Sequence, residues 1–332
     1  MQFDQLKRRE FITLLGGAAL AYPSDAQAQS STTGPLIGVL SPLSAAAATR
    51  NIAAFRSSLR DLGYMQGRSA TFELSYADGL PERLAPIARD LVALKPDVLM
   101  VGGMAGVAAV NSVTRTIPIV AIFGENPVTA GVASSIARPG GNVTGTWLGE
   151  DALIGKRLEF LKLALPHLAR VGAIFNPDDR SDAVGAAELP AAAKGLNMTV
   201  QMFEARDSAR ISQMEDQVAR SGVEALLVGG GPTLNSRRAE IAAMATRLRL
   251  PAGYGLREFA EAGGLMSYGP SLPDVYRQSA RLVAKILKGE HPANVPIEIP
   301  SRYELIVNLK AAKAIGLAMP DSFVLLADEV IE

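Results

Sequence analysis

The sequence of 332 residues contains no cysteine and only two histidines. The absence of cysteine excludes disulfide frameworks, thiolate metal sites, thiol nucleophiles and lipid attachment through a cysteine. Two histidines nearly exclude a multi-histidine metal centre. The 33 basic and 33 acidic residues cancel, which argues against a nucleic-acid binder with a strongly positive surface. We therefore expect no metal site and no nucleic-acid partner.

Catalytic motifs are also scarce. No Gly-x-Gly-x-x-Gly follows an expected strand, and no Gly-x-Ser-x-Gly nucleophile elbow occurs. Residues 149–157 partly match the motif of a phosphate-binding loop. They contain one residue too many, however, and Arg157 stands where the motif needs a magnesium-binding Ser or Thr. Asp178, Asp179 and Asp182 lack the glycine turn and final glutamate of a calcium loop. The sequence thus predicts no cofactor, no catalytic residues and no enzyme activity.

The N-terminus has the pattern of an export signal. Arg8 and Arg9 precede a moderately apolar run over residues 13–21, and Ala26 and Ala28 supply the small residues that follow. A basic segment, an apolar segment and an Ala-x-Ala site are typical of a signal peptide, and the paired arginines indicate the twin-arginine type. The apolar run is shorter than the roughly 20 residues that span a membrane. We expect cleavage after Ala28 and a periplasmic protein that is not embedded in the membrane.

From residue 35 onward, β-rich runs alternate with helical stretches. The pattern predicts strands at 37–41, 71–76, 98–101 and 118–123, with helices at 49–63, 81–94 and 105–113. Strands that alternate with helices indicate α/β architecture with mostly parallel sheets whose faces are covered.

The second half of the chain repeats this scheme. Residues 171–177, 225–230 and 246–251 resemble residues 37–42, 98–103 and 114–118, in the same order and at similar offsets. A repeat of this length indicates a duplicated domain, because solenoid units are shorter. Ligands of open parallel sheets bind beyond the carboxyl ends of the strands, so two such lobes predict a cleft. Glycine-rich loops that lead into helices there would favour anions or carboxylates, although glycine and proline also simply mark strand ends.

Several longer segments resemble a known family. They lie at residues 137–145, 155–162, 254–273, 285–289 and 304–313. Together they resemble the ABC transporter substrate-binding protein family that includes tryptophan/tyrosine-type uptake proteins. The resemblance implies a type I periplasmic-binding-protein fold, in which two Rossmann-like lobes are joined by three crossovers with a ligand cleft between them.

The resemblance also implies a non-contiguous division of the chain. The crossovers are expected near residues 147–150, 268–271 and 291–296. Residues 1–28 would be the twin-arginine signal peptide. Lobe one would contain residues 35–148 and 271–290, and lobe two would contain residues 149–270 and 296–332.

The expected ligand-binding residues follow the strand ends and one crossover. From lobe one they are Ser41, Gly103, Met104, Glu125 and Asn126, and from lobe two Asn176, Gly230, Gly231, Tyr254 and Tyr268. Ser41 and Asn176 occupy equivalent strand ends and are expected to face each other. The loops depart from the family pattern at residues 124–128 and 229–233 and at Met104, where the family often has threonine.

These observations predict a substrate-binding component of an ABC importer that captures a small polar solute, an amino acid or related carboxylate, by hinge closure. Its expected partners are that solute and an ABC permease with its ATPase, and the protein is expected to be a monomer. An exported ligand-sensing domain for a membrane signalling partner is one alternative. An exported hydrolase that uses acidic residues such as Glu125 with Asp182 is another.

Overall fold

The structure is a computed structural model that describes residues 34–332. The predicted signal peptide, residues 1–28, lies outside the described residues. Within the described part of the chain, no helix is long and apolar enough to cross a membrane.

The first sheet has five parallel strands in the order β2-β1-β3-β4-β5. The strands are β1 (Leu36–Ser41), β2 (Thr71–Tyr76), β3 (Val98–Gly102), β4 (Ile119–Phe123) and β5 (Val143–Trp147). The helical elements around it are α2 (Ala45–Asp61), η1 (Pro81–Arg83), α3 (Leu84–Ala93), α4 (Met104–Asn111), α11 (Leu272–Leu287) and η2 (Pro292–Asn294). We call this sheet with its helices lobe one.

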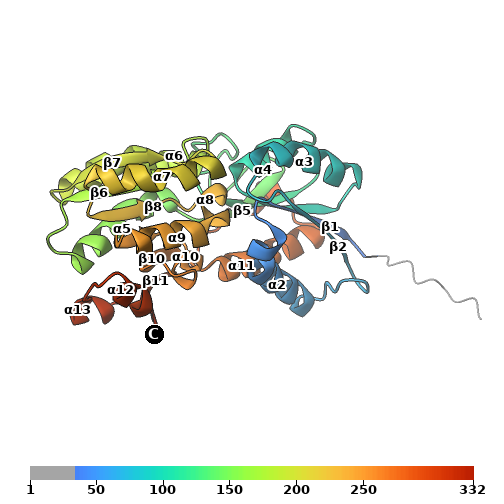
Figure 1. The fold of residues 1–332 in the computed structure, drawn as a ribbon. Coiled ribbons are helices and arrows are strands. Elements are labelled where there is room, and N and C mark those ends of the chain that lie inside the picture. Colours follow the sequence, from blue (N-terminus) through green and yellow to red (C-terminus); the bar gives the residue numbers. More distant parts are fainter. Residues whose placement is uncertain (1–33) are drawn as a thin grey trace, which may run out of the picture. The chain divides into compact units, whose positions relative to one another are not determined.

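Alternate residues of the central strand β3 face opposite sides of this sheet. Val98 and Met100 pack in the core that includes α2 and α11, while Leu99 and Val101 pack in the core that includes α3 and α4. Figure 1 shows the two helix pairs on opposite sides of the strands. This period of two on a sheet covered on both faces explains why β3 is apolar at consecutive positions.

The second sheet has seven strands in the order β12-β11-β10-β9-β8-β6-β7, with an antiparallel pairing only between β10 and β11. The strands are β6 (Arg170–Phe175), β7 (Thr199–Glu204), β8 (Ala225–Val228), β9 (Ala252–Tyr254), β10 (Met266–Pro270), β11 (Tyr303–Asn308) and β12 (Glu329–Ile331). Its helices are α5 (Glu150–Ala164), α6 (Arg180–Gly195), α7 (Ser208–Ser221), α8 (Pro232–Ser236), α9 (Arg238–Arg247), α10 (Arg257–Glu261), α12 (Leu309–Ala314) and α13 (Asp321–Val324). This set is lobe two, and the predicted architecture of two α/β lobes is confirmed.

Helix α2 begins four residues before the predicted start at Thr49. The cause is Ser44, whose hydroxyl accepts a hydrogen bond from the amide of Ala47 at 3.2 Å. A serine in this position satisfies one of the first helical N–H groups, which otherwise lack a partner.

Three crossovers join the lobes. The first lies between β5 and α5, and the second between β10 and α11, which returns to pack against α2 (Figure 1). The third lies later than the expected range of 291–296. Glu298 still pairs with β5, since Trp147 donates its amide to the Glu298 carbonyl at 2.8 Å, and the chain joins the second sheet only at Tyr303.

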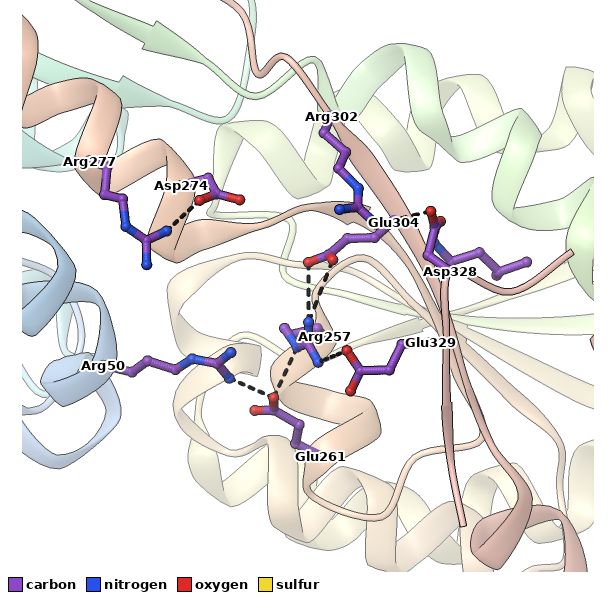
Figure 2. Close-up of polar contacts among 10 residues, drawn as sticks. Arg50, Arg257, Glu261, Asp274, Arg277, Arg302, Glu304, Asp328 and Glu329 are labelled. Atoms are coloured by element: carbon purple, nitrogen blue, oxygen red, sulfur yellow. Dashed lines mark hydrogen bonds and ion pairs between the residues drawn. The ribbon is translucent and has the colours of Figure 1, made fainter.

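The mostly buried Arg257 forms ion pairs with carboxylates on three elements of lobe two, α10, β11 and β12 (Figure 2). The Arg257 guanidinium is 2.9 Å from a carboxylate oxygen of Glu261, 3.4 Å from Glu304 and 2.6 Å from Glu329. Burial would lower the pKa of Arg257, but its hydrogen bond to Glu329 and the nearby charge of Glu304 outweigh that effect and raise the pKa. The side chains of Arg257 and Glu304 are only 11% and 10% exposed, so each charge is stabilised by its ion-pair partners in place of water.

We predict that Arg257→Met lowers the free energy of unfolding by about 3 kcal/mol, because the buried Glu304 carboxylate loses its cation. The matched control is Arg302→Met, whose guanidinium is 60% exposed and lies 3.1 Å from Asp328. An exposed pair of this kind contributes less than about 1 kcal/mol. Urea denaturation monitored by circular dichroism measures both variants, and equal losses would contradict the assigned role of Arg257.

Candidate functional site

A cavity of about 330 Å³ lies at the carboxyl ends of the parallel strands. Both lobes line it. Lobe one contributes Pro42 and Leu43 after β1, the turn from β3 into α4, and Leu272 and Tyr276 of α11. Lobe two contributes the N-terminal turn of α6 and the loop after β8. The predicted ligand cleft between the lobes is therefore present in the fold.

The N-terminus of α4 opens onto this cavity. No side chain caps the helix, and its first hydrogen bond runs from the Val107 amide to the Gly103 carbonyl at 3.1 Å. The preceding amides of Met104, Ala105 and Gly106 have no acceptor among the described residues. Met104 and Ala105 line the cavity. Unpaired N–H groups at the positive end of a helix dipole favour a carboxylate.

The equivalent helix end in lobe two is already occupied by the protein's own carboxylates. Asp179 caps α6 by accepting hydrogen bonds from the amides of Ser181 and Asp182, each at 3.1 Å. The buried Asp182 carboxylate accepts hydrogen bonds from the amides of Asn176 at 3.1 Å and Gly231 at 3.0 Å. The expectation that loops of both lobes favour anions is thus wrong for this helix end.

Asp182 also accounts for the glycines that follow β8. A Cβ atom on Gly229 would lie 2.4 Å from an Asp182 oxygen, and one on Gly231 would lie 2.8 Å from the other oxygen. Distances under 3.0 Å are not found for real Cβ atoms, so only glycine fits against this carboxylate. At Gly229 and Gly231 the departure from the family pattern is therefore a packing requirement.

The lobes touch at the side of the cavity. The Arg180 guanidinium of α6 lies 3.1 Å from the Glu125 carboxylate, which follows β4 and is buried. A Cβ atom on Gly124 would lie 2.6 Å from the Cβ of Ser181. Elsewhere Arg50 of α2 forms an ion pair with Glu261 at 2.6 Å (Figure 2). The lobes are thus in direct contact beside the cavity, through Arg180 and Glu125, and at a second place, through Arg50 and Glu261.

Tyr276 forms part of the wall beside a buried acid. Burial raises the pKa of the Tyr276 hydroxyl, the nearby Glu258 carboxylate raises it further, and a hydrogen bond with the Ser41 side chain lowers it. Burial likewise raises the pKa of Glu258, whose two carboxylate oxygens accept no hydrogen bond from any other described residue. This side of the cleft therefore holds hydroxyl and carboxyl groups away from water.

Three of the ten predicted ligand-binding residues, Gly103, Met104 and Gly230, line the cavity. The other seven do not line it. In lobe one, Ser41 accepts a hydrogen bond from the Leu43 amide at 3.2 Å, and Asn126 accepts one from the Val128 amide at 2.9 Å. These side chains, with Glu125, shape the loops that form the wall.

The remaining four predicted residues belong to lobe two. Asn176 accepts a hydrogen bond from the Asp178 amide at 3.0 Å and donates one to Thr233, while Gly231 donates its amide to Asp182. Tyr254 is fully buried, with its ring stacked on Phe259. The ring of Tyr268 packs edge-on against Phe160. Ser41 and Asn176 therefore do not face each other across the cavity: each is bonded within its own lobe.

Polar residues of the cavity wall that were not predicted from the sequence include Asn111, Asn235 and Tyr276. Asn111 shares a stripe of α4 with Met104 and Ala108, at spacings of three and four. Residues at these spacings share one face of a helix. If the N-terminus of α4 lines the cavity, the sequence alone therefore predicts that Asn111 lines it too. Asn235 and Tyr276 carry no such signal, since their positions depend on how α8 and α11 pack.

The model of the family described as ABC transporter substrate binding protein matches residues 36–331. The chain belongs to this family.

Individual relatives of this substrate-binding protein agree with that assignment. It is 24% identical over 263 residues to a tyrosine-binding protein of Clostridioides difficile (strain R20291), which covers 79% of this chain and 75% of the relative. The crystal structure of a conserved domain protein from Vibrio cholerae has a TM-score of 0.82 at 25% identity and covers 89% of this chain and 99% of that one. An ABC domain in complex with L-Trp from Streptococcus pneumonia also has a TM-score of 0.82, at 22% identity, and covers 90% of this chain and 100% of that one. These structures share the type I periplasmic-binding-protein fold.

We predict that Asp182→Ala lowers the free energy of unfolding by about 2 kcal/mol, because the amides of Asn176 and Gly231 lose their buried acceptor. Asp216→Ala is the matched control, since its carboxylate is 85% exposed and pairs with Arg220 one helical turn away. Chemical denaturation of both variants tests the assignment. A loss below about 0.5 kcal/mol for Asp182→Ala would show that the carboxylate does not hold these loops.

Proposed function

We propose that this substrate-binding protein is the periplasmic component of an ABC importer and captures a free amino acid by closing its lobes. The observation that carries the proposal is the opposite polarity of the two lobes at the cavity. The uncapped α4 N-terminus of lobe one suits a carboxylate. On lobe two, the wall holds three carboxylates, of Asp178, Asp179 and Asp182, and one guanidinium, of Arg180, so its net charge is negative and favours a positive group.

Asn235 also supports a ligand whose carboxylate faces lobe one and whose ammonium group faces lobe two. Its amide oxygen is buried in the wall contributed by lobe two and has no hydrogen-bond partner among the described residues. A buried acceptor without a donor costs about 1–3 kcal/mol, and an ammonium group of the ligand would recover that cost. A zwitterion therefore satisfies both lobes at once, whereas a sugar carries neither charge and a metal ion has no carboxylate for the α4 amides.

Much of the cavity wall is apolar. Leu43, Val107, Ile122, Val132 and Leu148 are among the residues that line it. Such a wall favours an amino acid with a large apolar or aromatic side chain. The relatives named for tyrosine and crystallised with L-Trp support this ligand class.

The hydrolase alternative has weaker support. Glu125 is paired with Arg180, and Asp182 accepts hydrogen bonds from two backbone amides. Carboxylates engaged in this way are poor candidates for proton transfer, since a general base must reach the substrate with a free lone pair. Recovery of the ligand unchanged after incubation with the protein distinguishes a receptor from an enzyme.

We predict that L-tyrosine, present at 100 times its Kd, adds about 2.7 kcal/mol to the free energy of unfolding. Tyramine, which lacks the carboxylate, should bind at least about 10-fold more weakly, because charge-assisted hydrogen bonds to the α4 amides are lost. Isothermal titration calorimetry and thermal unfolding measure both compounds. Stabilisation by sugars alone, or equal affinity for tyrosine and tyramine, would contradict the proposal.

Closure makes a separate prediction. Gly124→Val places atoms where Ser181 lies in the closed form, and overpacking of this kind costs about 1–3 kcal/mol. Affinity for tyrosine should fall about 10-fold or more, with an unchanged midpoint of unfolding without ligand. A ligand can shift the lobes only through its different contacts with the two states, so this variant should also lose the ligand-induced decrease in radius of gyration.

The matched control is Gly141→Val, because a Cβ atom at Gly141 meets nothing within 4 Å. It should keep the affinity and the scattering change of the parent protein. If Gly124→Val binds as tightly as Gly141→Val, approach of the lobes at Ser181 is not part of binding.

A further inference from the structure

One face of α4 runs along the cavity for the whole length of the helix. Met104, Ala105, Val107, Ala108 and Asn111 all line the cavity. These positions repeat every three or four residues and so form a single stripe. At 1.5 Å per residue, the stripe extends about 10 Å from the first residue of α4 to the last.

The two ends of this stripe are polar and its middle is apolar. The first end carries the unpaired amides of Met104 and Ala105. Val107 and Ala108 form the middle. At the far end, the Asn111 side-chain oxygen is buried and has no hydrogen-bond partner among the described residues. A buried amide oxygen without a donor is costly, so it calls for a donor from the ligand.

We propose that Asn111 accepts a hydrogen bond from a donor at the tip of the ligand side chain and so determines side-chain specificity. This inference rests on the proposed function, because it requires the ligand carboxylate to lie at the other end of α4. The span of about 10 Å then places the tip of an aromatic side chain near Asn111. A hydroxyl at that tip satisfies the amide oxygen, whereas a hydrocarbon tip leaves it buried and unpaired.

L-tyrosine and L-phenylalanine are the probes, because they differ only in the terminal hydroxyl. The parent protein should bind tyrosine about 10-fold or more tightly than phenylalanine, as sites that pair a ligand hydroxyl reject the analogue without it. Asn111→Leu should bring the ratio of the two affinities close to 1, mainly by weakening tyrosine. Calorimetry of each ligand with each protein gives the ratio directly.

Two further variants keep the test decisive. Asn111→Asp retains an acceptor of similar size and should retain the preference for tyrosine. Ser112→Ala, the control, alters the next residue, whose exposed hydroxyl bonds to the Ala109 carbonyl at 2.7 Å outside the cavity wall. It should leave the ratio unchanged.

The outcomes separate this inference from the function on which it rests. If the parent protein binds tyrosine and phenylalanine equally, or if Asn111→Leu keeps the full preference, the role of Asn111 is refuted while amino-acid capture stands. If neither amino acid binds the parent protein, both proposals are refuted. If Asn111→Asp loses the preference as completely as Asn111→Leu, the residue acts through the shape of the wall and not as an acceptor.

Discussion

The constraint on which the rest of the site depends is the need to satisfy the amides at the start of a helix. Parallel sheets gather helix N-termini at one edge, and each presents N–H groups without internal partners. At α6 the protein supplies Asp179 as the acceptor. At α4 it supplies none, and Met104 and Ala105 open onto the cavity. One lobe is thus closed to anions and the other is open to them.

The same carboxylates shape the chain around them. Asp182 binds the amides that follow β6 and β8, and it leaves no room for side chains at Gly229 and Gly231. Gly124 permits the lobe-one loop to approach Ser181 closely. Glycine in these loops therefore serves the packing of the cleft, and the polarity of the cleft arises from backbone amides and from acids held by backbone amides. Our proposal of zwitterion capture relies on this arrangement.

Much of the fold could be predicted from the sequence, because strands buried on both faces have a strong signal. The apolar run at Val98–Gly102 and its counterpart at Ala225–Val228 identified equivalent strands of two lobes. Boundaries set by single contacts were harder to predict. Because Ser44 caps α2, the helix starts earlier than predicted. Because Glu298 pairs with β5, the third crossover lies later than predicted.

The site was harder to predict than the fold, for a physical reason. A strand end predicts which loop reaches the cleft but not which side chain in that loop turns toward it. Ser41, Asn126 and Asn176 use their polar atoms on nearby backbone or side chains. Tyr254, one residue before its loop, belongs to the core. Asn235 and Tyr276 reach the wall from helices, and only the tertiary packing of α8 and α11 brings them there.

The most direct test of the account is a crystal structure of the protein with L-tyrosine bound. We predict a ligand enclosed between the lobes, with its carboxylate within hydrogen-bond distance of the Met104 and Ala105 amides and its ammonium group toward lobe two. A ligand carboxylate that lies against lobe two, or a ligand bound outside the cavity, would contradict the central claim that the uncapped end of α4 determines how the substrate is held.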